Sequence, residues 1–173
     1  AIPDSTMNLH CKLQSPIEFG ANYMYTEITD ERRFMFKNIL LAVDGSEHSM
    51  RAAQVAAGVA GCTGGSLRVL VAYDRIPPDL GDPFLERVVS ERVKEAETIL
   101  QKTLPVIGDP TGGLHTEILE GPVAEAILRV AETRHCDLIV MGSRGLGTLA
   151  GILLGSQSQK VLNHAPCPVL IVR

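Results

Sequence analysis

Short runs of consecutive apolar residues alternate along the chain with longer stretches in which apolar residues recur every three or four positions. The short runs predict β-strands, and the longer stretches predict amphipathic helices. The predicted strands cover residues 39–43, 67–73, 114–119, 137–141 and 169–172, and the predicted helices cover residues 46–60, 85–104, 123–131 and 156–164. This alternation predicts an α/β fold, a doubly wound and mostly parallel sheet of five strands with helices on both faces.

Capping residues and glycines mark the ends of the predicted helices. Ser46 is a suitable N-cap for the first helix, and Gly61, Gly64 and Gly65 are predicted to end that helix. Ser156 and Gln159 have the spacing of a capping box at the start of the last helix.

Composition supports a layered α/β domain and excludes some partners. Apolar residues make up 45% of the chain, but aromatic residues only 4% and tryptophan is absent, so a core of small aliphatic side chains is expected. A length of 173 residues is enough to bury such a core without disulfides or metal. The net charge of -4 gives no basic footprint for nucleic acid or for an anionic membrane.

The first part of the chain has no sustained period. Residues 1–34 are interpreted either as a natural N-terminal extension or as a segment added upstream of Met35, and residues 35–173 as one domain. No apolar run is long enough to cross a bilayer and no secretory signal is visible, so a cytoplasmic protein is predicted. The four cysteines, which lack the paired spacings of zinc or redox sites, are expected to be reduced and mostly buried; they are Cys11, Cys62, Cys136 and Cys167.

A glycine-rich region follows the fourth predicted strand. Gly142 and Gly145 come directly after that strand, and Gly155 precedes the last predicted helix. A strand, a glycine loop and a helix start together form an anion site, because free backbone N–H groups and the helix dipole point into one concavity. Glycines there also allow a phosphate to approach the backbone closely. The region therefore predicts a nucleotide phosphate site.

Two common phosphate motifs do not fit this region. A Walker A loop needs four residues between its glycines and a lysine after the second, whereas the spacing from Gly151 to Gly155 is too short and no lysine follows. A dinucleotide fingerprint would follow the first strand, where this chain instead has Asp44-Gly45-Ser46. Asp44 ends the first predicted strand, so it and the glycine region are expected to meet at the switch point of the sheet.

Three segments resemble the universal stress protein family, specifically its ATP-binding branch. They are Ala42-Val43-Asp44-Gly45-Ser46, the glycine pattern Gly142-x-x-Gly145-x9-Gly155-Ser156, and the ending His164-Ala165-Pro166-Cys167-Pro168-Val169. The resemblance covers residues 36–173, and Ala42 stands where many members have proline. It implies an adenine-nucleotide alpha-hydrolase-like fold with strand order 3-2-1-4-5, a single universal stress protein domain and a homodimer.

The resemblance also implies which residues meet the nucleotide. Asp44 with Ala42 and Val43 would contact the adenosine part, with Val71 near the base. The residues around the phosphates would be Gly142, Ser143, Arg144, Gly145, Gly155, Ser156, Gln157 and Ser158, preceded by Met141 at the strand end. The cofactor implied is ATP, with Mg2+ held mainly by the phosphates and no metal site made by the protein. Asp44 could instead cap the first helix, and Arg144 could be a solvated loop charge.

The last predicted strand has the features of an edge strand. Pro166 and Pro168 fit its beginning, where a missing N–H does least harm. An apolar edge is a liability unless it is paired. We therefore expect a homodimer through Val169, Leu170, Ile171 and Val172, as the resemblance also implies.

The sequence favours a regulatory ATP-binding module that acts in a stress response on an unknown protein partner. One alternative is a slow ATPase or adenylyl-transfer enzyme on the same fold. For that chemistry the region offers only Arg144 and no obvious base, so no catalytic residue is assigned. The other alternative is a dimeric interaction module without bound nucleotide. The apolar segment between Leu146 and Leu154 is interpreted as a lid or interface segment.

Overall fold

The computed structural model describes residues 36–76, 81, 84–146 and 154–173. The chain divides into two units, Ala1–Glu31 and Arg32–Arg173, and all described residues belong to the second. The predictions for residues 1–34, for Cys11 and for most of the segment between Leu146 and Leu154 lie outside the described residues.

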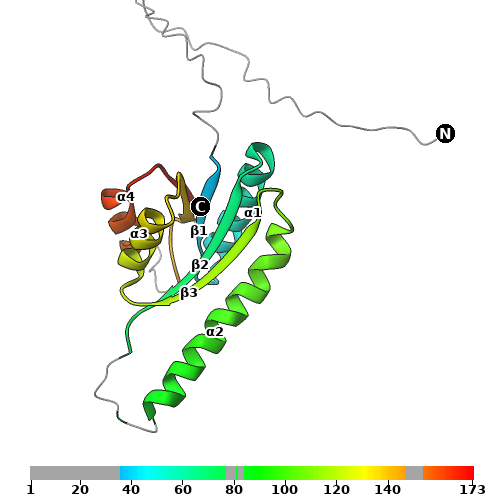
Figure 1. Cartoon of the computed structure of the whole chain (residues 1–173). Helices are drawn as coiled ribbons and strands as arrows, with labels where there is room; N and C mark the ends of the chain where they lie inside the picture. Colours follow the sequence, from blue (N-terminus) through cyan, green and yellow to red (C-terminus); the bar gives the residue numbers. More distant parts are fainter. Residues whose placement is uncertain (1–35, 77–80, 82–83, 147–153) are drawn as a thin grey trace, which may run out of the picture. The chain divides into compact units, whose positions relative to one another are not determined.

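Five strands and four helices alternate along the described chain (Figure 1). The strands are β1 (Asn38–Ala42), β2 (Ser66–Tyr73), β3 (Leu114–Glu120), β4 (Leu138–Gly142) and β5 (Val169–Val172), and the helices are α1 (Glu47–Thr63), α2 (Phe84–Ile107), α3 (Val123–Thr133) and α4 (Ser156–His164). All neighbouring strands are parallel, in the order β3-β2-β1-β4-β5. The predicted fold class and strand order are confirmed.

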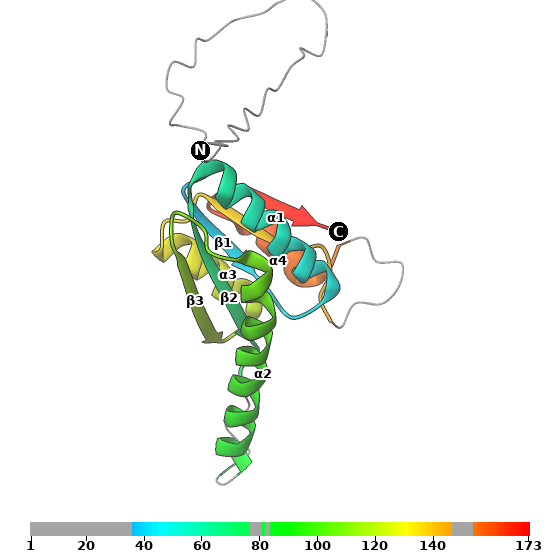
Figure 2. The ribbon, with the colours of Figure 1, turned by 90° about the vertical axis from the view of Figure 1, so that its right-hand side faces the viewer.

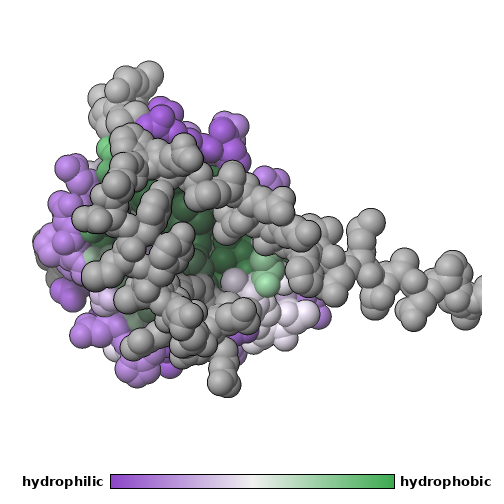
Figure 3. Space-filling view, turned by 90° about the horizontal axis from the view of Figure 1, so that it is seen from above, coloured by the Kyte–Doolittle hydropathy of each residue, from purple (hydrophilic) through white to green (hydrophobic). Residues whose placement is uncertain are grey.

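Helices cover both faces of the sheet (Figures 1 and 2). On one face, Ala52, Ala56 and Leu100 from α1 and α2 pack against strand residues such as Leu41 and Val69. On the other face, α3 and α4 supply a second cluster, with Ala124, Ile127, Val130, Ala131 and Val161 against Leu40, Leu70 and Ile139. In the space-filling view hydrophilic residues form the outer rim and hydrophobic residues show toward the middle (Figure 3). The three-layer arrangement follows from strands that are apolar on both faces.

The end of α1 lies within the predicted group of glycines, at its second member. Ser46 is the N-cap, as predicted, and its hydroxyl accepts a hydrogen bond from Ser49 N. The helix does not stop at Gly61 but continues to Thr63 and ends at Gly64, which has a φ of 61°. Glycine tolerates that left-handed conformation, whereas a glycine with helical angles, such as Gly61, only lowers helix propensity. Helix α2 also runs past its predicted end at Leu104, with Pro105 in its last turn.

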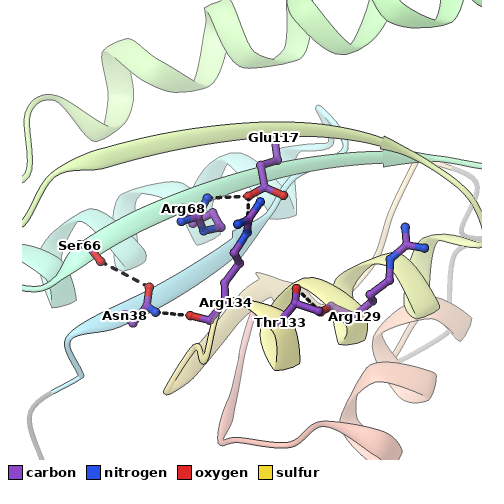
Figure 4. Close-up of polar contacts among 7 residues, drawn as sticks. All are labelled: Asn38, Ser66, Arg68, Glu117, Arg129, Thr133 and Arg134. Atoms are coloured by element: carbon purple, nitrogen blue, oxygen red, sulfur yellow. Dashed lines mark hydrogen bonds and ion pairs between the residues drawn. The ribbon is translucent and has the colours of Figure 1, made fainter.

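A polar cluster fixes the C-terminal end of α3 to the sheet (Figure 4). Glu117 Oε1 on β3 accepts hydrogen bonds from Arg68 on β2 at 2.6 Å and from Arg134, the C-cap of α3, at 3.1 Å. Asn38, at the start of β1, donates to the Arg134 carbonyl at 2.6 Å. These contacts hold α3 near the beginnings of the strands.

Two glycines allow two loops to touch near the starts of the strands. A Cβ atom on Gly112 would overlap the carbonyl group of Gly65 and the backbone nitrogen of Ser66, and a Cβ on Gly65 would lie 2.5 Å from the Phe36 carbonyl oxygen. Gly65 directly precedes β2, and Gly112 lies two residues before β3. The backbones at the starts of these neighbouring strands can therefore approach only because both residues lack a side chain.

The described cysteines are unpaired and differ in exposure. Cys136 is buried and Cys167 is half-buried, but Cys62 is exposed, so the expectation of a buried thiol is wrong for Cys62. Cys62 lies in the last turn of α1, on the side away from the sheet. Among the described helices, none is long and apolar enough to cross a membrane.

Thiol labelling of the folded protein should separate Cys62 from Cys136. Burial raises the pKa of the Cys136 thiol to about 11, so at pH 8 it carries less of the reactive thiolate than an exposed cysteine. We expect Cys62 to react rapidly and Cys136 to react only after unfolding, as followed by mass spectrometry of the modified peptides. Equal labelling rates in the folded protein would contradict the burial of Cys136.

Candidate functional site

A cavity of about 380 Å³ lies at the carboxyl ends of β1, β2 and β4. Its volume is within the range of about 300–1,000 Å³ that small-molecule sites occupy. The described residues that line it are Ala42, Val43, Asp44, Ser49, Leu70, Ala72, Asp74, Val123, Ile127, Met141, Gly142, Arg144, Gly145, Leu146, Gly155, Ser156, Gln157 and Ser158. Because β2 and β4 flank β1 in the sheet, the cavity occupies the switch point where ligands bind in doubly wound folds.

One side of the cavity is apolar. Leu70 and Ala72 from β2, Val123 and Ile127 from α3, and Met141 from β4 line it. Leu70, Ile127 and Met141 are buried members of the core cluster beneath α3 and α4. These side chains are held in place by the core, so this side can accept a flat, weakly polar ring without rearranging.

The other side of the cavity is polar. It is lined by the start of α4 and by described residues at the two ends of the glycine loop, residues 142–155. Residues 147–153 of this loop lie outside the described residues. The first turns of α1 and α4 reach the cavity through Ser49 and Ser156. Helix N-termini present N–H groups without intrahelical acceptors and the positive end of the dipole. This side is therefore suited to an anion.

Asp44 connects the end of β1 to the glycine loop. Its Oδ1 accepts a hydrogen bond from Ser46 N at 3.0 Å, and its Oδ2 accepts one from Leu146 N at 3.1 Å. A Cβ on Gly145 would lie 2.6 Å from the same Oδ2. The missing side chain of Gly145 thus leaves room for the Asp44 carboxylate, and the carboxylate fixes the first part of the loop.

Arg144 brings a positive charge to the cavity wall. Its Nε is buried and has no hydrogen-bond partner in the described structure, while its carbonyl accepts a bond from Ser46 Oγ at 3.3 Å. A buried guanidinium nitrogen without an acceptor is unfavourable. An anion in the cavity could supply that acceptor.

The far end of the glycine loop is also fixed. Gly155 N donates to the Ser143 carbonyl at 2.7 Å, and Ser158 Oγ donates to the Gly142 carbonyl at 2.9 Å. Gln157 Oε1 accepts a bond from Ala124 N at 3.2 Å. The amide of Gln157 thereby caps α3, whose own N-cap residue, Pro122, makes no side-chain cap bond. The start of α4 is thus held against both β4 and α3.

Comparison with known proteins identifies the family. The model of the universal stress protein family matches residues 35–173. The chain belongs to the universal stress protein family.

Relatives and solved structures agree with this family. A universal stress protein of Thermus aquaticus is 48% identical over 139 residues, which cover 80% of this chain and 100% of the relative. UspA of Lactobacillus plantarum has a TM-score of 0.72 at 29% identity, covering 80% of this chain and 98% of that one. A universal stress protein of Archaeoglobus fulgidus, solved in complex with dAMP, has a TM-score of 0.55 at 22% identity, covering 80% and 99%. At that identity the last comparison concerns the fold alone.

In this universal stress protein, the cavity brings together all of the predicted site residues except Val71 and Ser143. The side chain of Val71 is 3% exposed and packs in the core beneath α1 and α2, on the opposite face of the sheet. Ser143 is 1% exposed and does not line the cavity, and its N–H donates to the Val172 carbonyl at 2.7 Å. The structure therefore does not bring these two residues to the cavity.

The predicted capping box at the start of α4 is wrong. The N-cap is Gly155 rather than Ser156, and it makes no side-chain cap bond. Ser156 is the first helical residue, and Gln159 N donates to the Gly155 carbonyl at 2.9 Å. Because the helix starts one residue earlier than a Ser156 cap requires, Ser156 lies inside the first turn of α4, where it lines the cavity.

Several lining residues of this universal stress protein were missed by the sequence analysis; they are Ser49, Leu70, Ala72, Asp74, Val123, Ile127 and Leu146. Asp74 carries the same signal as Asp44, since it is the first polar residue after a parallel strand. Val123 and Ile127 belong to the predicted helix of residues 123–131, whose apolar residues were expected to face the core and not a ligand site. Leu70 and Ala72 are the neighbours of Val71 and point to the other face of β2.

Proposed function

We propose that this universal stress protein binds an adenine nucleotide, ATP with Mg2+, in the cavity at the ends of β1, β2 and β4. The observation that carries the proposal is the pairing of an apolar wall with an anion-binding wall that contains the unpartnered Nε of Arg144. The base would lie against Leu70, Ala72 and Ile127. The phosphates would lie toward Arg144 and the start of α4.

The polar groups of the cavity have bonding capacity left for the sugar and phosphates. Each Asp44 carboxylate oxygen accepts one backbone N–H, and a carboxylate oxygen can accept a second bond, so a ribose hydroxyl could donate there. Ser156 is exposed, is the first residue of α4 and lines the cavity. Hydrogen bonds to a charged group contribute about 1.5–3 kcal/mol each, so a few of them can hold a polyphosphate on an acidic protein. Mg2+ would be held mainly by the phosphates themselves.

The dAMP complex of the Archaeoglobus fulgidus relative supports the choice of ligand class, because it is an adenine nucleotide bound to a protein of the same fold. We favour ATP over a monophosphate because the polar lining combines Arg144 with both ends of the glycine loop and the start of α4, which together offer more donors than one phosphate needs. We propose that the bound nucleotide regulates contact with a protein partner in the cytoplasm, as part of a stress response.

We further propose that the protein acts as a homodimer through β5. This strand pairs only with β4 among the described strands and carries Leu170, which is 36% exposed. The outer backbone groups of an edge strand are available to another strand. Pairing with β5 of a second copy would cover them.

Isothermal titration of the full chain with ATP and Mg2+ tests the binding proposal. We expect a saturable heat and a rise in Tm, since a ligand at 100 times its Kd stabilises the folded state by about 2.7 kcal/mol. The absence of both the heat and the Tm shift would overturn the proposal. That result would favour an interaction module without nucleotide.

The proposal is binding rather than hydrolysis. The nearest carboxylate to the loop, Asp44, has both oxygens engaged with backbone N–H groups, which suits positioning better than activation of water. Slow or absent phosphate release in a single-turnover assay is expected. Rapid release that depends on Arg144 would instead favour an ATPase.

A further inference from the structure

Asp74 lines the cavity but has no role in the function proposed above. It is the first residue after β2, and it is exposed. Leu70, Ala72 and Asp74 all line the cavity, so alternate residues of one chain segment face it. Leu70 and Ala72 belong to the apolar side of the cavity, and Asp74 follows them at the carboxyl end of the same strand. The apolar wall against which a base would lie therefore ends in a carboxylate.

The backbone on both sides of Asp74 is fixed to β3 and to the residue after it. Gly121 N donates to the Tyr73 carbonyl at 2.9 Å, and Ile76 N donates to Glu120 Oε1 at 3.2 Å. Tyr73 and Glu120 are also partners in the register of β2 and β3. One of these bonds lies just before Asp74 and the other just after it. The Asp74 side chain is therefore carried by an anchored segment at the edge of the cavity.

The two carboxylates of the cavity differ in what they already bind. Asp44 accepts Ser46 N through Oδ1 and Leu146 N through Oδ2. Within the described part of the chain, the Asp74 carboxylate forms no hydrogen bond or ion pair. An ionised carboxylate accepts hydrogen bonds at both oxygens. Asp74 can therefore offer its whole accepting capacity to a ligand.

Three charged side chains follow one another across the strand ends at the cavity. Asp74 comes after β2, Asp44 after β1 and Arg144 after β4, and these strands are neighbours in the order β2-β1-β4. Because neighbouring strands lie about 4.8 Å apart, the ends of β2 and β4 are roughly 10 Å apart. The base, the sugar and the phosphates of a nucleotide also follow one another in a line. With the phosphates at Arg144 and the ribose at Asp44, the base reaches the end of β2.

The charges of these residues favour the same orientation. Arg144 attracts the phosphates and Asp74 repels them, so a polyphosphate is held toward β4. An ionised carboxylate accepts hydrogen bonds but donates none, so the group of the base that meets Asp74 must be a donor. In the adenine of a nucleotide, the exocyclic amino group is the one group with N–H donors. The end of β2 therefore matches the amino group of adenine.

We propose that Asp74 is a specificity-determining residue, whose carboxylate accepts a hydrogen bond from the exocyclic amino group of the bound adenine. The site then prefers a purine with that group over a purine without it. This inference rests on the proposed nucleotide function and adds to it the residue that recognises the base. Because Asp74 is exposed and exchanges a bond to water for the bond to the base, the expected preference is roughly tenfold, at the lower end for a hydrogen bond to a charged group.

The triphosphate of purine riboside, which differs from ATP in lacking the amino group, tests the proposal. Titration calorimetry with Mg2+ gives the ratio of its Kd to the Kd of ATP for each protein. We expect a ratio of about ten for the unchanged protein and about one for Asp74→Ala. Both ligands carry the same charge, so the loss of repulsion between Asp74 and the phosphates cancels in the ratio. Asp74→Asn, which keeps an acceptor oxygen, should retain part of the preference.

Asp109→Ala is the matched control, because it also removes one exposed carboxylate. Asp109 lies between α2 and the start of β3, at the opposite end of the strands from the cavity, and its replacement should leave the ratio near ten. A ratio near one in the unchanged protein, or an unaltered ratio in Asp74→Ala, would overturn the role of Asp74 and leave ATP binding itself intact. If neither nucleotide binds the unchanged protein, the proposed function is refuted, and this inference with it.

Discussion

Replacing Gly145 by valine is expected to lower the affinity for ATP by roughly 100-fold, or about 2.7 kcal/mol. A Cβ at this position lies 2.6 Å from Asp44 Oδ2, so the carboxylate must move and give up its bond to Leu146 N. The two methyl groups of valine would also occupy part of the cavity. The loss corresponds to one or two charge-assisted hydrogen bonds at about 1.5–3 kcal/mol each.

The measurement is titration calorimetry of folded Gly145→Val with ATP and Mg2+. Gly61→Ala is the control, because Gly61 lies in the last turn of α1 and a Cβ there meets no atom within 4 Å. It should bind ATP as the unchanged protein does. An unaltered affinity in Gly145→Val, with circular dichroism showing a native fold, would place the nucleotide elsewhere.

Gly112→Ala is expected to destabilise the domain by about 3 kcal/mol, at the upper end of the usual cost of overpacking. The added Cβ overlaps the carbonyl group of Gly65 and the nitrogen of Ser66. These are backbone atoms at the start of β2, and Ser66 N is bonded to the Lys37 carbonyl at 2.8 Å. No side-chain rotation can relieve the overlap, so the starts of β2 and β3 must separate.

Urea unfolding monitored by circular dichroism checks this expectation. Gly58→Ala provides the matched glycine control, since Gly58 is inside α1 and a Cβ there meets nothing within 4 Å. That change should stabilise the protein by about 0.5–1 kcal/mol, because alanine favours the helix. A Gly112→Ala midpoint equal to that of the unchanged protein would show that the loops do not need to touch.

The elements of the fold were predictable because the strand runs are uninterrupted and bounded by glycine, proline or charge. The strand order came from the family resemblance, since periodicity cannot say which parallel strands are neighbours. The end of α1 could be assigned only to a group of glycines because Gly61 and Gly64 look alike in sequence. Only Gly64 adopts a positive φ, and this depends on where the chain turns toward β2.

Residues at the carboxyl end of a strand could be assigned to the site from the sequence, whereas residues in the middle of a strand could not. Asp44, Gly142 and Gly145 stand at strand ends, and all three line the cavity. Within β2 the run Leu67–Tyr73 is apolar at almost every position, so the sequence gives no sign of which residues face α3. The family resemblance assigned Val71 to the nucleotide, and nothing in this run indicates that Leu70 and Ala72 line the cavity instead.

The glycine contact between the starts of β2 and β3 also bears on how the chain folds. Gly65 and Gly112 are separated in sequence by β2 and the whole of α2, so their contact closes a long chain segment and forms only after considerable ordering. Strand β3 should therefore join the sheet late. In a chevron analysis Gly112→Ala would then accelerate unfolding far more than it slows folding, which makes the edge of the sheet farthest from β5 the first part of the domain to detach.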